Sequence, residues 1–377
     1  MKIVIDDKIP YIRGAFEPYA DVLYLSGPAT TASVVKDAAA IVTRTRTNCN
    51  KELLDGSSVK IIATATIGFD HIDTDYCERN GIRWTNAPGC NSKSVEQYIA
   101  SVLMVWAEKQ ERKLSDSCIG IIGVGNVGSK VARISELLGM KVLLNDPPRA
   151  RREQSGDFVD ISVIQQEADI ITLHVPLETA GEDPTYHLIN PLFVNGLKKQ
   201  ALLINSCRGE VTDTSAVKLA VQAGQIAGFV ADCWENEPDI DRELMEMCFL
   251  ATPHIAGYSK DGKATGTRMS VQSISRFLGM ELNNWEPAGI EPPLKPVLHI
   301  NGKGLSDQEI VARAILHSYD IRDDDTAFRS KPEAFEQLRG DYPVRREFPA
   351  YTIKAENIPP SVLNILSQLG FRIDGVH

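Results

Sequence analysis

The sequence predicts an α/β protein with two doubly wound parallel-sheet domains and a small α+β domain at the C-terminus. Short apolar runs alternate with amphipathic segments from the start of the chain, and this βαβ rhythm is typical of parallel sheets covered on both faces. A second such series starts near Cys118, and its first loop is rich in glycine. The composition changes again at Trp285, before a proline-rich stretch. The expected boundaries are residues 1–92, 93–256, a returning segment 257–285, and 286–377.

The first domain is expected to contain buried strands followed by a long helix. Its short apolar runs are residues 3–5, 22–25, 40–42 and 61–63. A loop at residues 86–89, Asn-Ala-Pro-Gly, interrupts the rhythm. Helix-forming residues and an alternation of apolar and charged positions then predict a helix from about residue 94 to residue 113.

The second domain has the pattern of a doubly wound dinucleotide-binding domain inserted into the first. Its expected strands are residues 118–122, 141–144, 170–173, 201–204, 227–230 and the short 249–251. A helix over about residues 266–282 is expected to carry the chain back to the first domain.

The C-terminal tail begins after a proline-rich link at residues 292–296. Within it we expect a helix near residues 307–319, an acidic turn at residues 323–325, and a helix near residues 361–369 followed by a short strand.

The composition argues against some classes of partner. With 40 Lys and Arg against 50 Asp and Glu, the net charge of −10 disfavours nucleic acid and anionic membranes. No stretch reaches transmembrane length, and the N-terminus lacks a signal-peptide core. The seven cysteines form no Cys-x-x-Cys pair, which is typical of reduced thiols in a cytoplasmic protein and gives no indication of a metal site.

A glycine loop at residues 123–128, Gly-Val-Gly-Asn-Val-Gly, follows an apolar strand and opens a helical pattern. Glycines allow a tight turn and a close approach of the backbone to a pyrophosphate, which then faces the helix N-terminus. Asp146 ends the next strand, where an acid that binds ribose hydroxyls belongs. The expected contacts of this loop with a dinucleotide are Gly123, Gly125, Asn126, Val127, Gly128 and Asp146.

The carboxylate of Asp146 favours NAD, because it would repel an extra ribose phosphate. Three cations just beyond it, Arg149, Arg151 and Arg152, weaken the exclusion of NADP. The alternative for the whole loop is a turn of packing glycines with a solvated acid.

Three residues in the second half of the chain have the chemistry of hydroxy-acid oxidation. Arg208 can hold a carboxylate and polarise an oxygen that becomes a carbonyl. His254 can accept a hydroxyl proton, and Glu237 can orient the imidazole and stabilise its charged form. Taken singly, Arg208 could be a surface charge, Glu237 a turn residue, and His254 a loop histidine whose hydrogen bonds are satisfied. Together they follow predicted strands, at the edge of the sheet where ligands bind in open α/β folds.

The motifs around these residues resemble the D-isomer-specific 2-hydroxyacid dehydrogenases. The matching phrases are the glycine loop and residues 205–209, 232–238 and 252–257. The resemblance implies that Arg208, Glu237 and His254 are catalytic. It also implies that residues 1–92 with the returning helix form a substrate (lid) domain, and that residues 93–256 bind NAD.

Finer details at residues 64–73, 86–91, 146–149 and 254–259 resemble family members that oxidise a small phosphorylated hydroxy acid. The tail after about residue 286 resembles their dimerisation domain, which implies a homodimer. The implied substrate contacts are Thr45, Thr66 and Tyr258. The implied cofactor contacts are Asp146, Val175, Ser206, Cys207, Arg208, Asp232 and Gly257. At the position of Val175 the family commonly has a hydroxyl residue, and valine offers only its backbone and packing.

A substrate phosphate requires cations, and Arg44 and Arg46 flank Thr45. The alternative is that both are solvated loop charges. Tyr258 could donate to the phosphate or to a substrate hydroxyl, or could serve as a packing aromatic.

Two other functions are compatible with these motifs. A dehydrogenase of 3-phosphoglycerate often carries a βαββαβ regulatory domain, a rhythm that the tail lacks. NAD-sensing corepressors of the same fold can keep the same three residues without catalysing turnover.

Overall fold

A computed structural model describes residues 1–375, and the chain forms two compact units. The first unit contains residues 1–91 and 259–291, and the second contains residues 92–258 and the chain from 292 onward. Parallel sheets of 5 and 6 strands and a further 3-stranded sheet confirm the predicted α/β class. None of the helices described in this part of the chain is long and apolar enough to cross a membrane.

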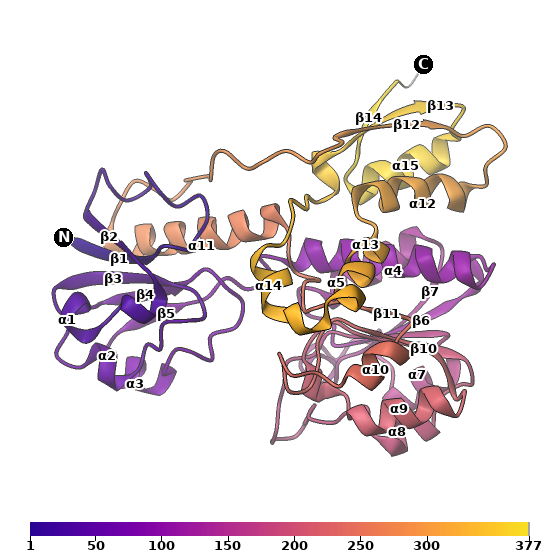
Figure 1. The fold of residues 1–377 in the computed structure, drawn as a ribbon, viewed down its shortest axis with the longest axis horizontal. Coiled ribbons are helices and arrows are strands. Elements are labelled where there is room, and N and C mark those ends of the chain that lie inside the picture. The colour runs from indigo at the N-terminus through magenta and orange to yellow at the C-terminus, as the bar shows by residue number, and fades with distance from the viewer. Residues whose placement is uncertain (376–377) are drawn as a thin grey trace. The chain divides into compact units, whose positions relative to one another are not determined.

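The first unit is built on a parallel sheet with the strand order β2-β1-β3-β4-β5 (Figure 1). Its strands are β1 (Lys2–Asp6), β2 (Asp21–Leu25), β3 (Ala38–Thr43), β4 (Ile61–Thr64) and β5 (Arg83–Thr85). Its helices are α1 (Ala32–Val35), α2 (Lys51–Leu54), α3 (Thr74–Arg79) and α11 (Lys260–Leu278). The four predicted strands are present, and β5 is an additional edge strand.

Helix α11 covers one face of this sheet. It was predicted over 266–282 but begins at Lys260, because the Ser259 hydroxyl caps it by accepting a hydrogen bond from Gly262 N at 2.8 Å. It ends at Gly279, whose φ of 70° is left-handed. A Cβ on Gly266 would lie 2.5 Å from the Ala65 carbonyl oxygen, so glycine there lets α11 approach the loop that follows β4.

The larger sheet of the second unit is parallel, with the strand order β11-β10-β9-β8-β6-β7. Its strands are β6 (Cys118–Ile122), β7 (Lys141–Asn145), β8 (Ile170–Leu173), β9 (Ala201–Asn205), β10 (Ile226–Ala231) and β11 (Leu250–Ala251). Its helices are α4 (Ser92–Lys109), α5 (Gly128–Leu137), α6 (Pro147–Glu153), α7 (Ile161–Glu167), α8 (Pro191–Asn195), α9 (Thr214–Gln222) and α10 (Arg242–Met247). All six predicted strands are present, and the chain reverses direction across the sheet between β6 and β8, where such folds bind nucleotides.

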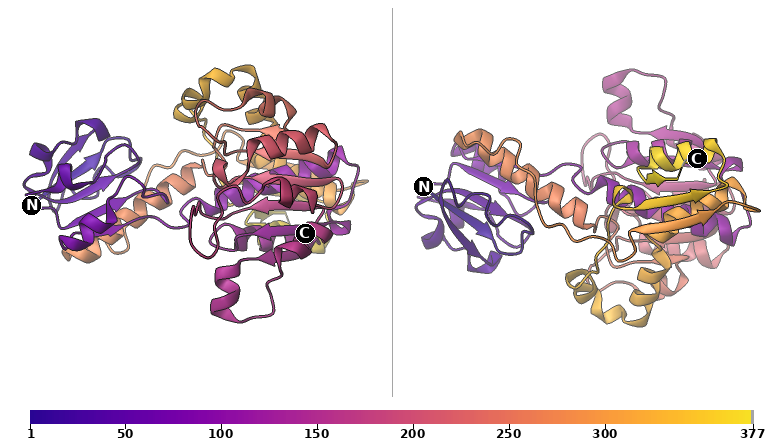
Figure 2. Two further views of the ribbon diagram at one scale, coloured as in Figure 1. Left: turned by 90° about the horizontal axis from the view of Figure 1, so that it is seen from below. Right: turned by 90° about the horizontal axis from the view of Figure 1, so that it is seen from above.

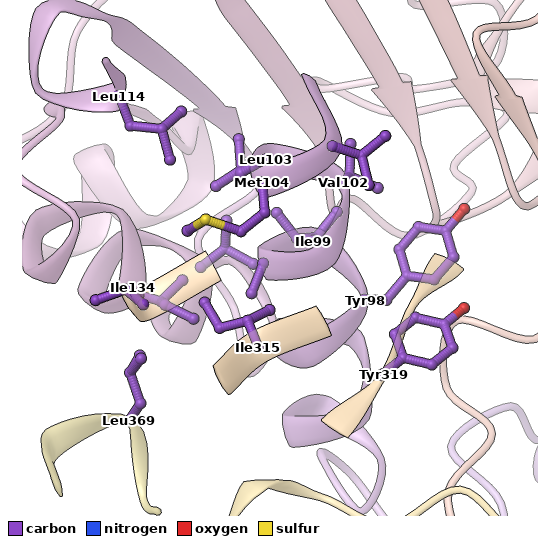
Figure 3. Packing of buried hydrophobic residues seen from close by; sticks show 14 of the residues in the cluster. Tyr98, Ile99, Val102, Leu103, Met104, Leu114, Ile134, Ile315, Tyr319 and Leu369 are labelled. Atoms are coloured by element: carbon purple, nitrogen blue, oxygen red, sulfur yellow. The ribbon is translucent and has the colours of Figure 1, made fainter. Parts of the chain in front are cut away.

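Helix α4 lies at the centre of the second unit and is buried over most of its length. Figure 3 shows its residues packed against Ile134 of α5, Ile315 and Leu369. The last two residues belong to the tail helices α12 (Asp307–Ser318) and α15 (Pro360–Leu369). The larger sheet with its helices and the tail therefore share one hydrophobic core.

The tail forms a small parallel sheet of β12 (Val297–Asn301), β13 (Thr352–Glu356) and β14 (Arg372–Asp374). Figures 1 and 2 show α12 and α15 on the side of this sheet that faces α4. The helices α13 (Ile321–Ser330) and α14 (Phe335–Gly340) connect α12 to β13.

The predicted acidic turn at residues 323–325 is wrong, because these residues lie inside α13. Asp320 caps this helix by accepting from Arg322 N, and acids in the first turn favour the helix dipole. Ile321 and Phe328 are fully buried and fix the helix against the second unit.

Candidate active site

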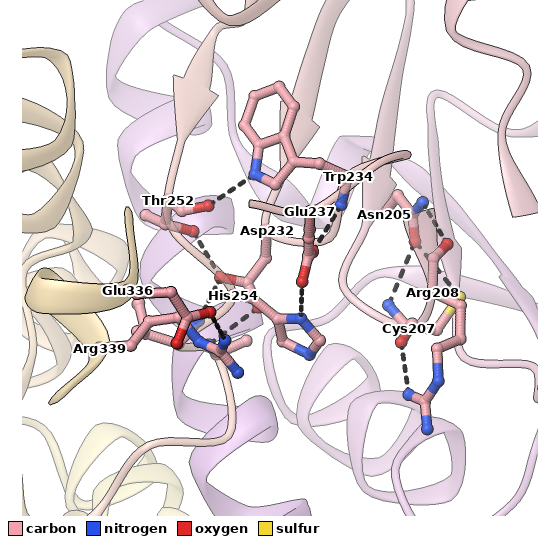
Figure 4. A network of polar contacts seen from close by, with 12 residues as sticks. Asn205, Cys207, Arg208, Asp232, Trp234, Glu237, Thr252, His254, Glu336 and Arg339 are labelled. Carbon is pink, nitrogen blue, oxygen red and sulfur yellow. Dashed lines mark hydrogen bonds and ion pairs between the residues drawn. The ribbon is translucent and has the colours of Figure 1, made fainter. Parts of the chain in front are cut away.

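The catalytic candidates lie at the carboxyl edge of the larger sheet (Figure 4). Arg208 follows β9, Glu237 lies in the loop after β10, and His254 follows β11. His254 Nδ1 and Glu237 Oε2 are 2.8 Å apart, with side chains 32% and 21% exposed. The other Glu237 oxygen accepts from Trp234 N at 2.9 Å, so the carboxylate is fixed between its own loop and the imidazole.

The loop that carries His254 is held by the buried carboxylate of Asp232. Its oxygens accept from Ile255 N at 2.7 Å, from Ala256 N at 2.9 Å and from the Thr252 hydroxyl at 2.7 Å. Burial raises the pKa of Asp232, against these hydrogen bonds, which lower it. His254 itself has a left-handed φ of 55°, an unusual conformation for a non-glycine residue that this network supports.

Arg208 lies in a loop that approaches the Glu237 loop closely. A Cβ on Gly209 would lie 1.9 Å from the Trp234 carbonyl oxygen, so only glycine fits after Arg208. Asn205 Nδ2 donates to the Arg208 carbonyl at 2.8 Å and fixes the loop from the strand side. The guanidinium donates to the Cys207 carbonyl at 2.8 Å and is partly exposed, so further donors are left for a ligand.

A cavity of about 620 Å³ opens beside the glycine loop of the second unit. Gly123, Gly125, Asp146 and Val175 are among its lining residues. Gly123 must be glycine, because its φ is 87° and a Cβ would lie 2.7 Å from His174 backbone atoms. A Cβ on Gly125 would meet nothing within 4 Å, so protein packing does not explain that glycine, whereas approach of a pyrophosphate does.

Helix α5 presents its N-terminus to the same loop, with no acidic residue in its first turn. Asn126 is exposed and Val127 is partly exposed at the approach to the helix, and Gly128 is buried against the Gly123 carbonyl. An anion is therefore electrostatically favoured at this helix end.

The other predicted cofactor residues border this region from β8 and β9. The Ser206 hydroxyl is buried and has no hydrogen-bond partner within the protein, which suits a residue that serves a ligand. Burial raises the pKa of the Cys207 thiol to about 11, so this cysteine is not a nucleophile at neutral pH. Burial also lowers the pKa of His174 to about 3, and this neutral ring pairs with Thr172 at 3.0 Å.

Asp146 helps to shape the loop. Its carboxylate accepts from Val124 N at 2.8 Å and, as the cap of α6, from Arg149 N at 3.0 Å. Arg149 pairs with Glu153 at 2.7 Å, and Arg151 pairs with Asp183. These ion pairs neutralise the positive charge of Arg149 and Arg151. Both arginines are therefore less suited to bind the extra phosphate of NADP.

The substrate residues predicted in the first unit follow β3 and β4. Thr66 lies beside Thr64 at 2.7 Å and donates to the Gly68 carbonyl at 2.9 Å, while Asn86 donates to the Ile67 carbonyl at 2.7 Å. Thr45 is exposed at the end of β3. Thr66 therefore lies in a loop that is held by hydrogen bonds, and Thr45 lies in a solvent-exposed loop.

Arg44 and Arg46 flank Thr45. A third cation, Lys263, interacts with Arg44, and no sequence pattern indicated it. Burial, followed by the charges of Arg44 and Lys260, lowers the pKa of Lys263 to about 8. Lys263 lies in the first turn of α11, where basic residues are not favoured by the helix dipole. Glu291 pairs with Lys260 at 3.1 Å and offsets part of this positive charge, and the remaining cations suit an anionic ligand.

Gly257 and Tyr258 follow His254 within the second unit. The Tyr258 ring lies edge to face with Tyr342 of the tail, with ring centroids 5.7 Å apart. The buried Arg345 of the tail donates to the carbonyls of Ile255 at 3.4 Å and Ala256 at 3.3 Å. The tail therefore contacts and supports the loop that carries His254, which no sequence pattern predicted.

Cys233, Glu237 and His254 offer three ligand atoms within 4.8 Å of one another, in the part of the chain that the structure describes. Burial keeps the pKa of the Cys233 thiol well above its usual value, which disfavours the thiolate that a soft metal requires.

Comparison with known proteins places these features in a family. The family model "D-isomer specific 2-hydroxyacid dehydrogenase, NAD binding domain" matches residues 92–256, and a domain of unknown function matches residues 293–370. An erythronate-4-phosphate dehydrogenase of Bacteroides thetaiotaomicron is 51% identical over 94% of this chain and 99% of its own. One of Edwardsiella ictaluri is 39% identical over 98% of this chain and 99% of its own.

Solved structures agree with the fold. A D-lactate dehydrogenase of Aquifex aeolicus with NAD and lactic acid covers 78% of this chain and 100% of its own, at 26% identity and a TM-score of 0.60. A D-2-hydroxyisocaproate dehydrogenase covers 74% of this chain and 97% of its own, at 22% identity and a TM-score of 0.62, and shows the fold alone. The chain therefore belongs to the D-isomer-specific 2-hydroxyacid dehydrogenases, a family of NAD-dependent enzymes.

Proposed function

We propose that this enzyme oxidises 4-phospho-D-erythronate at C2 to (R)-3-hydroxy-2-oxo-4-phosphobutanoate with NAD, in the biosynthesis of pyridoxal 5′-phosphate. The relatives named erythronate-4-phosphate dehydrogenase, which match nearly the whole chain, support this substrate. The observation that carries the chemistry is the His254–Glu237 pair beside Arg208 at one edge of the sheet.

The His254–Glu237 hydrogen bond determines which nitrogen can act as the base. Because Glu237 Oε2 accepts from Nδ1 at 2.8 Å, the neutral imidazole carries its proton on Nδ1 and leaves the Nε2 lone pair for the substrate hydroxyl. When Nε2 takes that proton, Glu237 stabilises the resulting imidazolium. NAD supplies the hydride acceptor.

Arg208 is proposed to bind the substrate carboxylate. A guanidinium carries donors in a planar fork that matches a carboxylate, and only one donor of Arg208 has an identified protein partner. The charge also favours polarisation of the oxygen that becomes the carbonyl.

For the cofactor we propose contacts from the glycine loop (Gly123 to Gly128), Asp146, Val175, the Ser206–Arg208 segment, Asp232 and Gly257. The open space at Gly125 and the unpartnered Ser206 hydroxyl support this set. The Asp232 carboxylate already accepts three hydrogen bonds from its own loop, so its contribution is proposed to be positioning.

For the substrate we propose contacts from Thr45, Thr66, Arg44, Arg46 and Tyr258. The cations beside Thr45 suit a phosphate, and the braced Thr66–Gly68 loop suits a carboxylate. Exchange of Arg46 for glutamate should raise KM for the phosphorylated substrate, and an unchanged KM would remove Arg46 from the set.

We further propose that the chain acts in the cytoplasm as a homodimer joined through its tail. The described cysteines are all free, and most are buried, as is common in reducing compartments. Sedimentation of the full chain should give about twice its 41.5 kDa mass, and a monomer mass would contradict the dimer.

A substrate panel tests the proposed function. The purified enzyme is offered 4-phospho-D-erythronate, D-erythronate and 3-phosphoglycerate with NAD or NADP, and reduced cofactor is followed by absorbance. We expect the highest kcat/KM with 4-phospho-D-erythronate and NAD. Turnover of 3-phosphoglycerate alone would assign a different hydroxy acid, and no turnover with any substrate would favour an NAD-sensing role.

A further inference from the structure

Helix α14 of the tail brings a cation, Arg339, to the catalytic edge of the second unit. Figure 4 draws Arg339 and Glu336 beside the His254–Glu237 pair. The Arg339 guanidinium carbon lies 5.8 Å from the centroid of the Tyr258 ring and 5.6 Å from that of Phe335. Tyr258, a proposed substrate contact, belongs to the loop that carries His254, so Arg339 lies beside that loop.

The position of Arg339 is fixed, but its hydrogen-bonding capacity is only partly used. Its side chain is 23% exposed, and Nη1 donates to Glu336 at 2.8 Å. Nε is buried without a hydrogen-bond partner in the protein. A buried donor of a charged group that lacks a partner is costly, and a bound anion would supply the missing acceptor.

The surroundings keep Arg339 charged. Burial lowers the pKa of its guanidinium, but the nearby Tyr258, Glu336 and Glu237 outweigh that effect and the pKa is raised. The aromatic faces of Tyr258 and Phe335 further favour a cation at this place.

We propose that Arg339 is a substrate-binding residue that holds the phosphate of the hydroxy acid. This inference rests on the proposed function, and it gives the tail, whose family model has no known function, a part in the active site. Arg208 already serves the carboxylate end, so a second arginine near Tyr258 suits the other anionic end of the same molecule. During binding, the phosphate oxygens accept from Nε and compete with Glu336 for Nη1.

The test compares Arg339→Gln with the wild-type enzyme on 4-phospho-D-erythronate and on D-erythronate, which lacks the phosphate. We expect KM for 4-phospho-D-erythronate to rise about 10- to 100-fold, the usual effect of losing a charge-assisted hydrogen bond, with kcat changed much less. The kcat/KM for D-erythronate should stay the same. Arg339→Lys should recover part of the loss, because it keeps the charge without the planar fork.

Two variants separate binding from structural support. Glu336→Gln breaks the same ion pair but keeps the guanidinium, so KM should stay the same or fall; a rise like that of Arg339→Gln would mean that the pair only holds α14 in place. Arg322→Gln removes an exposed arginine of the same tail, bonded to Asp320 and Glu108, and should leave both substrates unaffected.

The outcomes distinguish this inference from the proposed function. If the wild-type enzyme does not oxidise 4-phospho-D-erythronate, the proposed function fails first. Equal losses on both substrates for Arg339→Gln would overturn phosphate binding. If D-erythronate is not turned over, inhibition by inorganic phosphate gives the comparison: its Ki should rise in Arg339→Gln, and an unchanged Ki would overturn the inference.

Discussion

At the scale of single residues, the proposed acid–base step depends on one hydrogen-bonded pair, His254 and Glu237. Replacing His254 with alanine removes the only proton acceptor assigned to the substrate hydroxyl, so kcat should fall about 10²- to 10⁴-fold. NAD affinity should change little, because His254 itself is not among the proposed NAD contacts. Steady-state NADH formation and equilibrium NAD titration measure the two quantities. A variant that kept the wild-type kcat would assign the base elsewhere.

Arg208 is held by Asn205 and Gly209 so that its side chain can reach a carboxylate. Arg208→Lys keeps the charge but loses the planar fork, and kcat/KM should fall by about tenfold or more. Thermal unfolding of the variant controls for loss of the fold. Wild-type kcat/KM in a folded Arg208→Lys enzyme would contradict carboxylate binding at this position.

Lys263 links charge to stability in the first unit. Its pKa is lowered from 10.5 to about 8, so between these values the folded chain binds fewer protons than the unfolded chain. The free energy of unfolding should therefore rise as the pH increases through this window, and the charged lysine should cost stability below it.

Lys263→Met tests that linkage. The variant should unfold at a higher temperature than wild type at pH 7, and the difference should shrink towards pH 10, where the wild-type lysine is neutral in the folded chain. Calorimetry at both pH values gives the comparison. A difference independent of pH would show that Lys263 is not the titrating group.

The position of Arg208, Glu237 and His254 at one edge of the sheet could be predicted from sequence, because each follows a strand and strand ends meet at one edge of a parallel sheet. Lys263 and Arg339 could not. The position of Lys263 depends on how α11 returns to its sheet, and that of Arg339 depends on how α14 packs beside Tyr258. Neither contact produces a periodic pattern of residues in the sequence.

At the scale of elements, the buried strands of the two larger sheets were predicted, as were the partly exposed β2 and β14. The partly exposed β12 and β13 and the short edge strand β5 were missed, because none of them has an apolar run of three residues. The acids at 323–325 suggested a turn, since the helix there is identified only by its cap and by the buried Ile321 and Phe328.

Helix α13 docks the tail onto the edge strand β11. Asp325 accepts from Ala251 N at 2.7 Å and pairs with Arg329 at 2.9 Å, and Arg329 donates to the carbonyls of Met245 and Cys248. Arg329→Ala should lower the free energy of unfolding by about 2–3 kcal/mol, because partly buried acceptors lose a charged donor. Chemical denaturation measures this change.

Arg313→Ala is the control for this docking contact, because it removes an arginine from an exposed position on α12. It should leave the free energy of unfolding nearly unchanged, since surface substitutions of this kind have small effects. An equal decrease in the free energy of unfolding of the two variants would mean that α13 has no special role in holding the tail.

At the scale of the molecule, the tail and the NAD-binding region lie in one compact unit. Tail residues such as Ile315 and Leu369 belong to the same buried cluster as α4 and α5, although the sequence suggested a separate domain after residue 286. The proline-rich link suggested a domain boundary, because the sequence of a linker does not show where the helix after it packs.

A single truncation in the shared core tests this unity. Ile315 is fully buried against α4, so Ile315→Ala should cost about 2–5 kcal/mol. If the core is shared, amide hydrogens of α4 should lose protection from exchange together with those of α12, and NAD-binding residues should melt in the same transition. Leu294→Ala, at a position 94% exposed, should change neither. Loss of protection confined to residues 292–375 would instead mean that the tail folds independently of the nucleotide-binding sheet and supports the catalytic loop only by docking onto it.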